Sequence, residues 1–328
     1  MYRIINIYRI ITSDKLQKFK LIIALLCLFS RAEADSTSVS PAFPVYSQYL
    51  QNGLVINPAY SGARGALSGF LSYRKQWIGI AGAPNLQTIS LHTPFKNDRD
   101  AVGFLAQFMQ YGFTKMTSIY GSYAHNINYG NGKLSMGMNA GFNVLNNNFY
   151  DIQTVKPDKV FTSNENPYIL PNFGVGAYYY DERMFAGLSI PQLLSYRKSS
   201  SNSVQAYHSF SEYDFILTGG GLFDLNDFIK LKPSFLLQYS LDKSKKVKQF
   251  DISGNLIISD LVWVGASWRT NEKAIVGIVQ LQVNQQLMVG LSGDYPLGRV
   301  NAIRNGSAEF CLRYEFGTKI SAANPRYF

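Results

Sequence analysis

Residues 249–258 read Gln-Phe-Asp-Ile-Ser-Gly-Asn-Leu-Ile-Ile, and apolar and polar side chains alternate along this stretch. Phe250, Ile252 and Leu256 fall on one face of an extended chain, whereas Asp251 and Asn255 fall on the other. Because successive side chains of a β-strand point to opposite sides, this period of two predicts a strand with one apolar and one polar face.

The same alternation recurs along the chain, most clearly over residues 133–144 and 307–316. Counting every such run predicts about fourteen strands, an even number as in bacterial outer-membrane barrels. The predicted strands begin near residues 66, 86, 101, 116, 132, 171, 183, 211, 228, 248, 261, 274, 286 and 306. Short turns alternate with links that are mostly longer, as expected for tight periplasmic turns and larger outer loops.

The composition supports a wall that faces lipid. Only 16% of the 328 residues are charged, whereas soluble domains carry about 25%. The 22 Tyr and 22 Phe residues rule out disorder, and past residue 30 no apolar run approaches the ~18 residues of a spanning helix. We therefore expect an all-β, transmembrane antiparallel up-and-down β-barrel of about 14 strands, of the outer-membrane type.

Aromatic residues near predicted strand ends suggest girdles at the two membrane interfaces. These residues are Trp77, Tyr178, Tyr179, Tyr180, Trp263 and Trp268.

The N-terminus indicates export. Lysines precede the apolar run 21–29, and Ala32-Glu33-Ala34 offers a small-x-small cleavage site. We expect residues 1–34 to be an extension and cleaved signal peptide, residues 35–65 a periplasmic segment, residues 66–317 the barrel, and residues 318–328 a C-terminal tail. Cys311 is then the one cysteine of the mature chain, so no intramolecular disulfide is expected.

Several motifs appear in order along the mature chain: Ile56-Asn57-Pro58-Ala59-Tyr60-Ser61-Gly62, Arg74-Lys75-Gln76-Trp77, Gly82-Ala83-Pro84, Leu134-Ser135-Met136-Gly137, Pro171-Asn172-Phe173-Gly174-Val175-Gly176 and Phe185-Ala186-Gly187-Leu188-Ser189. Together with the C-terminal Asn324-Pro325-Arg326-Tyr327-Phe328, this set resembles the PorP/SprF family of the type IX secretion and gliding machinery of Bacteroidetes. Asn85 departs from the family pattern, which more often has Thr directly after the Pro of Gly-Ala-Pro.

Six residues of the first motifs are candidates for a docking or a structural role: Asn57, Pro58, Tyr60, Arg74, Gln76 and Trp77. Asn57-Pro58 is a turn initiator, and Arg74 alternates with Lys75 at a predicted strand end. These features favour an architectural role, and an exposed epitope for a partner is the alternative.

The tail residues Pro325, Arg326, Tyr327 and Phe328 follow the last predicted strand at a distance. They are interpreted either as a displaced assembly signal or as a segment that docks a periplasmic partner.

Strand parity places seven charged residues on the inner face of the wall: Lys230, Lys232, Asp251, Asp294, Glu309, Arg313 and Glu315. Enclosed charges need partners or water. A cross-barrel ion network and the selectivity filter of an open channel are both consistent with this set.

Catalysis has little support. The three histidines His92, His125 and His208 lie in no recognisable nucleophile motif. Ser90 and His92 share a strand face, but no orienting acid is visible. We therefore expect no enzyme activity, no cofactor, no metal site and no nucleic-acid partner.

Two functions remain open. The resemblance implies a non-enzymatic component of type IX secretion or gliding in the bacterial outer membrane. Its partners would be outer-membrane lipid, a secreted adhesin-like client protein, a periplasmic peptidoglycan-associated protein and other secretion components. The alternative is an outer-membrane channel for a small hydrophobic or polar solute.

Overall fold

Each predicted strand is present in the computed structural model, which describes residues 44–147, 167–198, 204–241, 247–270, 273–297 and 306–317. The observed strands begin within three residues of the predicted positions. The fourteen strands of the wall are β1 (Leu67–Lys75), β2 (Asn85–Pro94), β3 (Asp100–Tyr111), β4 (Thr114–Tyr129), β5 (Gly132–Asn147), β6 (Tyr168–Tyr180), β7 (Met184–Ile190), β10 (Asp214–Gly221), β12 (Ile229–Ser240), β13 (Val247–Ile258), β14 (Val262–Arg269), β15 (Ala274–Gln282), β16 (Leu287–Pro296) and β17 (Ser307–Phe316).

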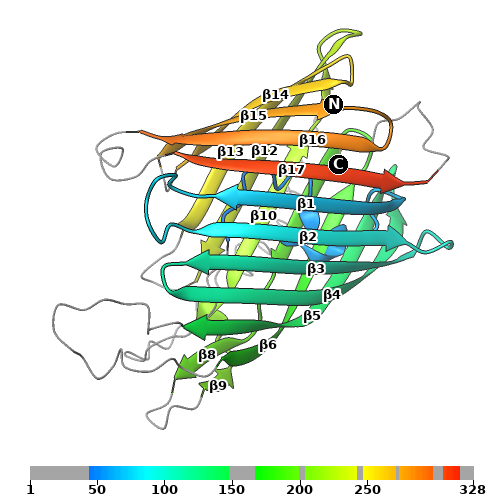
Figure 1. Ribbon diagram of the computed structural model, residues 1–328. Helices are drawn as coiled ribbons and strands as arrows, with labels where there is room; N and C mark the ends of the chain where they lie inside the picture. Colours follow the sequence, from blue (N-terminus) through cyan, green and yellow to red (C-terminus); the bar gives the residue numbers. More distant parts are fainter. Residues whose placement is uncertain are drawn as a thin grey trace, which may run out of the picture. The chain divides into compact units, whose positions relative to one another are not determined.

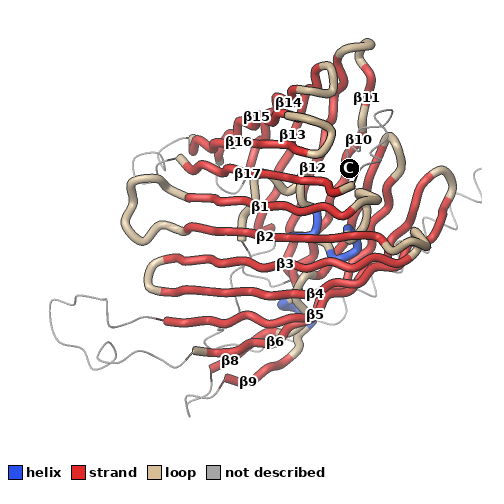
Figure 2. The backbone as a smooth tube through the Cα atoms, turned by 45° about the vertical axis from the view of Figure 1, so that its right-hand side comes forward, coloured by secondary structure: helices blue, strands red, loops and turns tan. Residues whose placement is uncertain are grey.

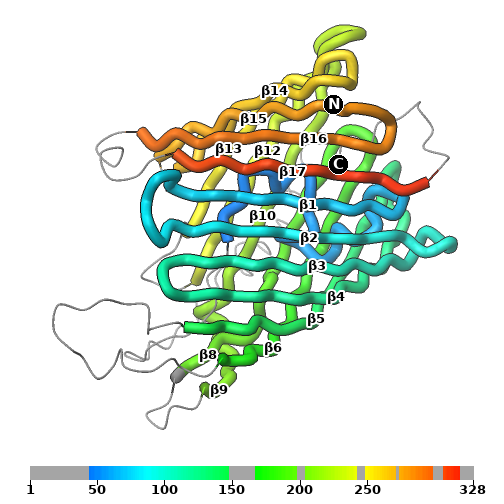
Figure 3. Tube along the Cα trace, in the orientation of Figure 1, coloured from blue at the N-terminus to red at the C-terminus, as the bar shows by residue number. Residues whose placement is uncertain are grey.

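These strands form a closed antiparallel barrel (Figure 1). Each wall strand pairs with its neighbours along the chain, and β10 joins β7 to β12. Strand β1 closes the ring against β17, which lies beside it in Figure 3. A separate hairpin, β8 (Ser195–Lys198) and β9 (Val204–Tyr207), and the short strand β11 (Phe223–Asp224) complete the described strands. Within the described residues, no helix is long and apolar enough to cross a membrane.

The two faces of the wall differ as the alternation predicts. On β13, Ile252 is 53% exposed and faces outward, whereas Asp251 is 1% exposed and faces the lumen. The outer face is therefore the apolar one, which is the arrangement required by a lipid surround.

The two ends of the barrel differ in their connections. At one end, here called the turn end, neighbouring strands join through tight turns such as Ser259–Asp260, whose positive φ values of 51° and 57° suit a two-residue hairpin. The other end, here called the loop end, carries the links between β1 and β2, β5 and β6, and β7 and β10. In outer-membrane barrels such tight turns are typical of the periplasmic side.

A plug formed by residues 44–65 occupies the barrel lumen (Figure 2). Nearly all its residues are buried, and it contains two short 3-10 helices, η1 (Gly53–Val55) and η2 (Pro58–Tyr60). This placement corrects the expected periplasmic position of these residues. The polar residues of the segment find their partners on the inner face of the wall, which a sequence pattern cannot show.

Three girdle predictions also need correction. Tyr180 shares the parity of Tyr178 on β6, and its ring lies 5.6 Å from that of Tyr178 in a cluster that includes the plug residue Tyr60. Tyr178 and Trp263 are 5% and 4% exposed and point into the lumen. Trp263 and Trp268 are five residues apart on one strand and so lie on opposite faces; Trp268, which is 40% exposed, is the one that faces outward.

Candidate functional site

The plug is fastened to the wall through Asn57, which precedes η2. The backbone N–H of Ala59 donates to Asn57 Oδ1 at 3.0 Å, and Asn57 Nδ2 donates to the carbonyl oxygen of Ala177 at 2.9 Å. An Asn at the N-cap followed by Pro at the first helical position is a favoured way to begin a helix. A single side chain thus starts η2 and ties it to β6.

Two wall glycines make room for this helix. A Cβ atom on Gly176 would lie 2.1 Å from Asn57 Oδ1, and a Cβ atom on Gly137 would lie 2.4 Å from the backbone nitrogen of Ala59. Such distances are far shorter than normal contacts, so only glycine permits this close approach. Both glycines belong to the motifs quoted above.

Tyr60 organises the half of the plug near the turn end. Its hydroxyl oxygen accepts a hydrogen bond from Arg64 Nε at 3.1 Å, and its ring packs edge-on against His92 and Tyr178 at centroid distances of 5.4 and 5.5 Å. His92 Nδ1 accepts a hydrogen bond from the backbone N–H of Gly62 at 3.1 Å. His92 therefore has a structural role, because it holds the plug. The sequence had raised only a catalytic role for this residue.

A buried ion network holds the plug near the loop end. Arg74 Nη2 lies 2.6 Å from Asp294 Oδ2, and Arg74 Nη1 lies 3.4 Å from Glu309 Oε2. Ser47 bridges the pair, since its backbone N–H donates to Glu309 Oε2 at 2.9 Å and its hydroxyl accepts from Arg74 Nη1 at 2.8 Å. Strands β1, β16 and β17 are thereby joined to the plug.

Arg269 extends this network to β13 and β14. Its Nε lies 3.3 Å from Asp251 Oδ2, and its Nη2 donates to the carbonyl oxygen of Tyr46 at 3.3 Å. Arg269 and Asp251 are each 1% exposed. Removing one residue of such a pair would leave the other as a buried charge without its counter-charge, which destabilises the fold.

A second set of contacts between plug and wall lies further from the loop end. Arg64 Nη1 is 3.4 Å from Glu315 Oε1, and Arg313 Nη1 donates to Gln51 Oε1. Gln51 Nε2 in turn donates to Gln280 Oε1 at 2.7 Å. The plug is therefore bonded to the wall along its whole length.

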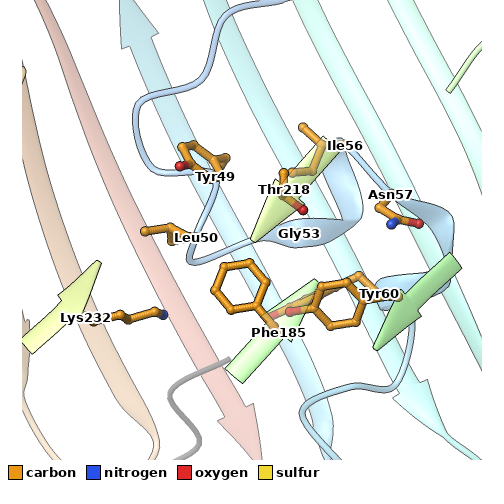
Figure 4. Close-up of a pocket in the computed structure, with 10 residues that line it drawn as sticks. Tyr49, Leu50, Gly53, Ile56, Asn57, Tyr60, Phe185, Thr218 and Lys232 are labelled. Carbon is orange, nitrogen blue, oxygen red and sulfur yellow. The ribbon is translucent and has the colours of Figure 1, made fainter. Parts of the chain in front are cut away.

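Lys232 lies between aromatic rings. It is 1% exposed, and its Nζ lies 5.8 Å from the ring centre of Phe185 and 5.4 Å from that of Trp263. A cation over an aromatic face is stabilised by the ring quadrupole. Lys232 also borders a cavity of about 20 Å³ beside the plug residues Leu50 and Tyr60 (Figure 4), which is room for about one water molecule.

Tyr46 and Tyr49 of the plug are buried. Burial raises the pKa of Tyr49 to about 12 and raises the pKa of Tyr46 further.

Of the seven inner-face charges expected from parity, six are buried in the lumen: Lys232, Asp251, Asp294, Glu309, Arg313 and Glu315. Lys230 is at the turn end instead, where its Nζ lies 2.8 Å from Asp260 Oδ1. The buried carboxylates lie beside arginines, which corresponds to the cross-barrel network rather than the open filter.

The six candidate motif residues separate into two groups. Asn57, Pro58, Tyr60 and Arg74 are buried between plug and wall, so they present no surface to a partner. Gln76 and Trp77 are half-buried at the start of the β1–β2 link, at the loop end. The tail candidates Pro325, Arg326, Tyr327 and Phe328 lie outside the described residues.

Sequence reasoning missed Arg64, Arg269 and the polar plug residues Ser47 and Gln51. Arg269 shares the parity of Ser267 on β14, so alternation could have found it. The plug has no strand period, so alternation gives no signal for Ser47 and Gln51. Within the described part of the chain, no group of three or more His, Cys, Asp or Glu side chains could hold a metal ion.

The family model for the type IX secretion system membrane protein PorP/SprF matches residues 39–314. The chain belongs to the PorP/SprF family. This match covers the whole plug, residues 44–65, and nearly the whole wall of the PorP/SprF barrel. No curated protein matches the chain significantly.

One solved structure shares the barrel fold of this PorP/SprF protein, and two others are less similar. The CymD monoaromatic hydrocarbon channel is 10% identical, with a TM-score of 0.53 over 85% of this chain and 95% of that chain. The Acinetobacter baumannii outer membrane protein Omp33 is 8% identical, with a TM-score of 0.44 over 77% and 100% of the two chains. A Pseudomonas aeruginosa FadL homologue is 11% identical, with a TM-score of 0.42 over 84% and 95%. At these identities the first likeness shows the fold alone, and the other two carry no argument.

Proposed function

We propose that this PorP/SprF barrel assists the export or surface attachment of a secreted protein as a non-enzymatic component of the type IX machinery. The observation that carries the proposal is the filled lumen. Arg74 and Arg269 anchor the plug near the loop end, and Asn57 and Arg64 anchor it further down. A barrel filled in this way serves its partners through its rims and outer wall rather than through a pore.

The proposed partners follow from the two ends of the barrel. An adhesin-like client would meet the loop end, which lies opposite the tight turns. A periplasmic peptidoglycan-associated protein and further secretion components would meet the turn end, and lipid surrounds the wall.

The test is a chromosomal deletion in the source bacterium, complemented by the wild-type gene. We expect the deletion to lower the cell-surface amount of one or more secreted proteins at least about tenfold, measured by surface labelling and mass spectrometry. An unchanged set of surface proteins would contradict the proposal.

The C-terminal tail offers a second, independent test. If residues 318–328 dock a periplasmic partner, their deletion leaves barrel insertion normal and lowers secretion. If they are an assembly signal, the same deletion prevents insertion, which is measured by the heat-dependent gel mobility of folded barrels.

A further inference from the structure

The link between β1 and β2 presents an apolar surface at the loop end. Residues 77–84 read Trp-Ile-Gly-Ile-Ala-Gly-Ala-Pro and contain no charged side chain. Ile78 and Ile80 are 46% and 36% exposed, and Phe113 in the neighbouring β3–β4 turn is 43% exposed. We call Ile78, Ile80, Ala81 and Phe113 the apolar rim patch.

The backbone that carries this patch is held by its own hydrogen bonds. Gln76 N–H donates to the carbonyl oxygen of Pro84 at 2.8 Å, and Ile80 N–H donates to that of Trp77 at 3.1 Å. Trp77 has a φ of 45°, a value that non-glycine residues adopt rarely and that the surroundings must maintain.

Two further bonds join the link to its neighbours. Ile78 N–H donates to the carbonyl oxygen of Gly306, which precedes β17, at 2.9 Å. Gly112 N–H donates to the carbonyl oxygen of Gly82 at 2.7 Å and so joins the β3–β4 turn to the link. The apolar side chains are therefore displayed on a preformed surface, which lowers the entropic cost of binding.

The strand register separates this patch from the lipid-facing belt. One outward row crosses β1 to β5 through directly paired residues, and all its members are polar: Lys75, Asn85, Gln110, Lys115 and Asn146. Two rows closer to the barrel centre, the outward residues are apolar: Leu71, Ile89, Ala106, Ile119 and Phe142. A row with two lysines marks the level of the headgroups, where long cationic side chains reach water.

We propose that the apolar rim patch binds an uncharged, apolar segment of the secreted protein that this barrel helps to export or retain. Exposed apolar clusters outside a lipid belt are typical of protein-binding surfaces. Lipid is disfavoured because the polar row lies between the patch and the belt. A second barrel in the same membrane would meet this one through the belt, and a periplasmic partner would meet the turn end. The proposal rests on the proposed secretion function.

A photo-crosslinking experiment in the source bacterium tests the assignment. A benzoyl-phenylalanine residue replaces Ile80 in one strain and, as the matched control, replaces Phe228, which is 68% exposed at the turn end. We expect the probe at position 80 to capture a protein whose surface amount falls in the deletion strain, at least about fivefold more than the control probe. Capture of lipid alone, or of a second copy of the barrel alone, would overturn the proposal.

Substitution gives an independent readout. Ile78→Ser combined with Ile80→Ser is expected to lower the surface amount of the same client at least about fivefold, with unchanged amounts of folded barrel. Ile78→Leu combined with Ile80→Leu is the matched control, because it keeps both exposed side chains apolar, and it is expected to leave the client unchanged. Normal client levels in the Ile78→Ser/Ile80→Ser variant refute the rim patch, whereas normal levels in the deletion strain refute the secretion function itself.

Discussion

Asn57 of the plug donates its side-chain amide to the carbonyl oxygen of Ala177 in β6, 2.9 Å away, across 120 residues of sequence. The same side chain accepts the N–H of Ala59. The bond joins the plug to the middle of the wall.

Asn57→Ala should lower the free energy of unfolding by about 1–3 kcal/mol, because it removes an N-cap and leaves buried polar groups without partners. Urea denaturation of the barrel in lipid vesicles measures this change. Asn146→Ala is the matched control, since Asn146 is exposed on the outer face, and its effect should stay within about 0.5 kcal/mol. Equal effects of the two variants would show that the cap is unimportant.

Gly176→Ala should destabilise the barrel by about 1–3 kcal/mol, because the added methyl group would overlap the side chain of Asn57. Gly254→Ala is a suitable control, because a Cβ atom at Gly254 meets nothing within 4 Å. Both variants are compared by the same urea titration. A Gly176→Ala barrel as stable as the control would mean that η2 does not seat against β6.

Arg74→Ala should cost about 3–5 kcal/mol, because Asp294 and Glu309 would remain charged and buried without their shared cation. The double variant Arg74→Ala/Glu309→Gln should recover part of this loss. A double-mutant cycle measures the recovery. Strict additivity of the two single changes would contradict the network.

Deletion of residues 44–65 should open the lumen. In planar bilayers the wild-type barrel is expected to conduct at least about tenfold less than the deleted form, which would have the bore of a fourteen-strand barrel. The folded state of each form is checked by heat-dependent gel mobility. A wild-type barrel with a robust, solute-selective current would favour the solute channel over the secretion component.

The wall could be predicted from sequence because each strand carries its own signal. Asp251 and Ile252 are adjacent in sequence and differ in exposure from 1% to 53%, and a period of two records this difference directly. Parity also located Glu309 and Arg313 on the inner face. In a soluble protein the apolar face of a strand points inward, whereas in this barrel the polar face does. The low charge content of the chain indicated this inversion.

The plug could not be predicted, because nothing local distinguishes a polar segment in water from one enclosed by polar walls. Ser47 and Gln51 find their partners at Glu309 and Arg313, each 262 residues further along the chain. The resemblance singled out Asn57 and Tyr60 without indicating what they touch. Trp263 illustrates a related difficulty. An aromatic residue near a strand end belongs to a girdle only if its side chain points outward, and that of Trp263 points into the lumen.

The separation of these partners has a consequence for assembly. The ion network near the loop end joins Ser47 to Arg74 at the beginning of the barrel and to Asp294 and Glu309 at its end. Contacts between such distant segments are non-local, and non-local contacts slow folding. The charges of β1 therefore gain their counter-charges only when β16 and β17 arrive, so closure of the ring and neutralisation of its interior are one cooperative event.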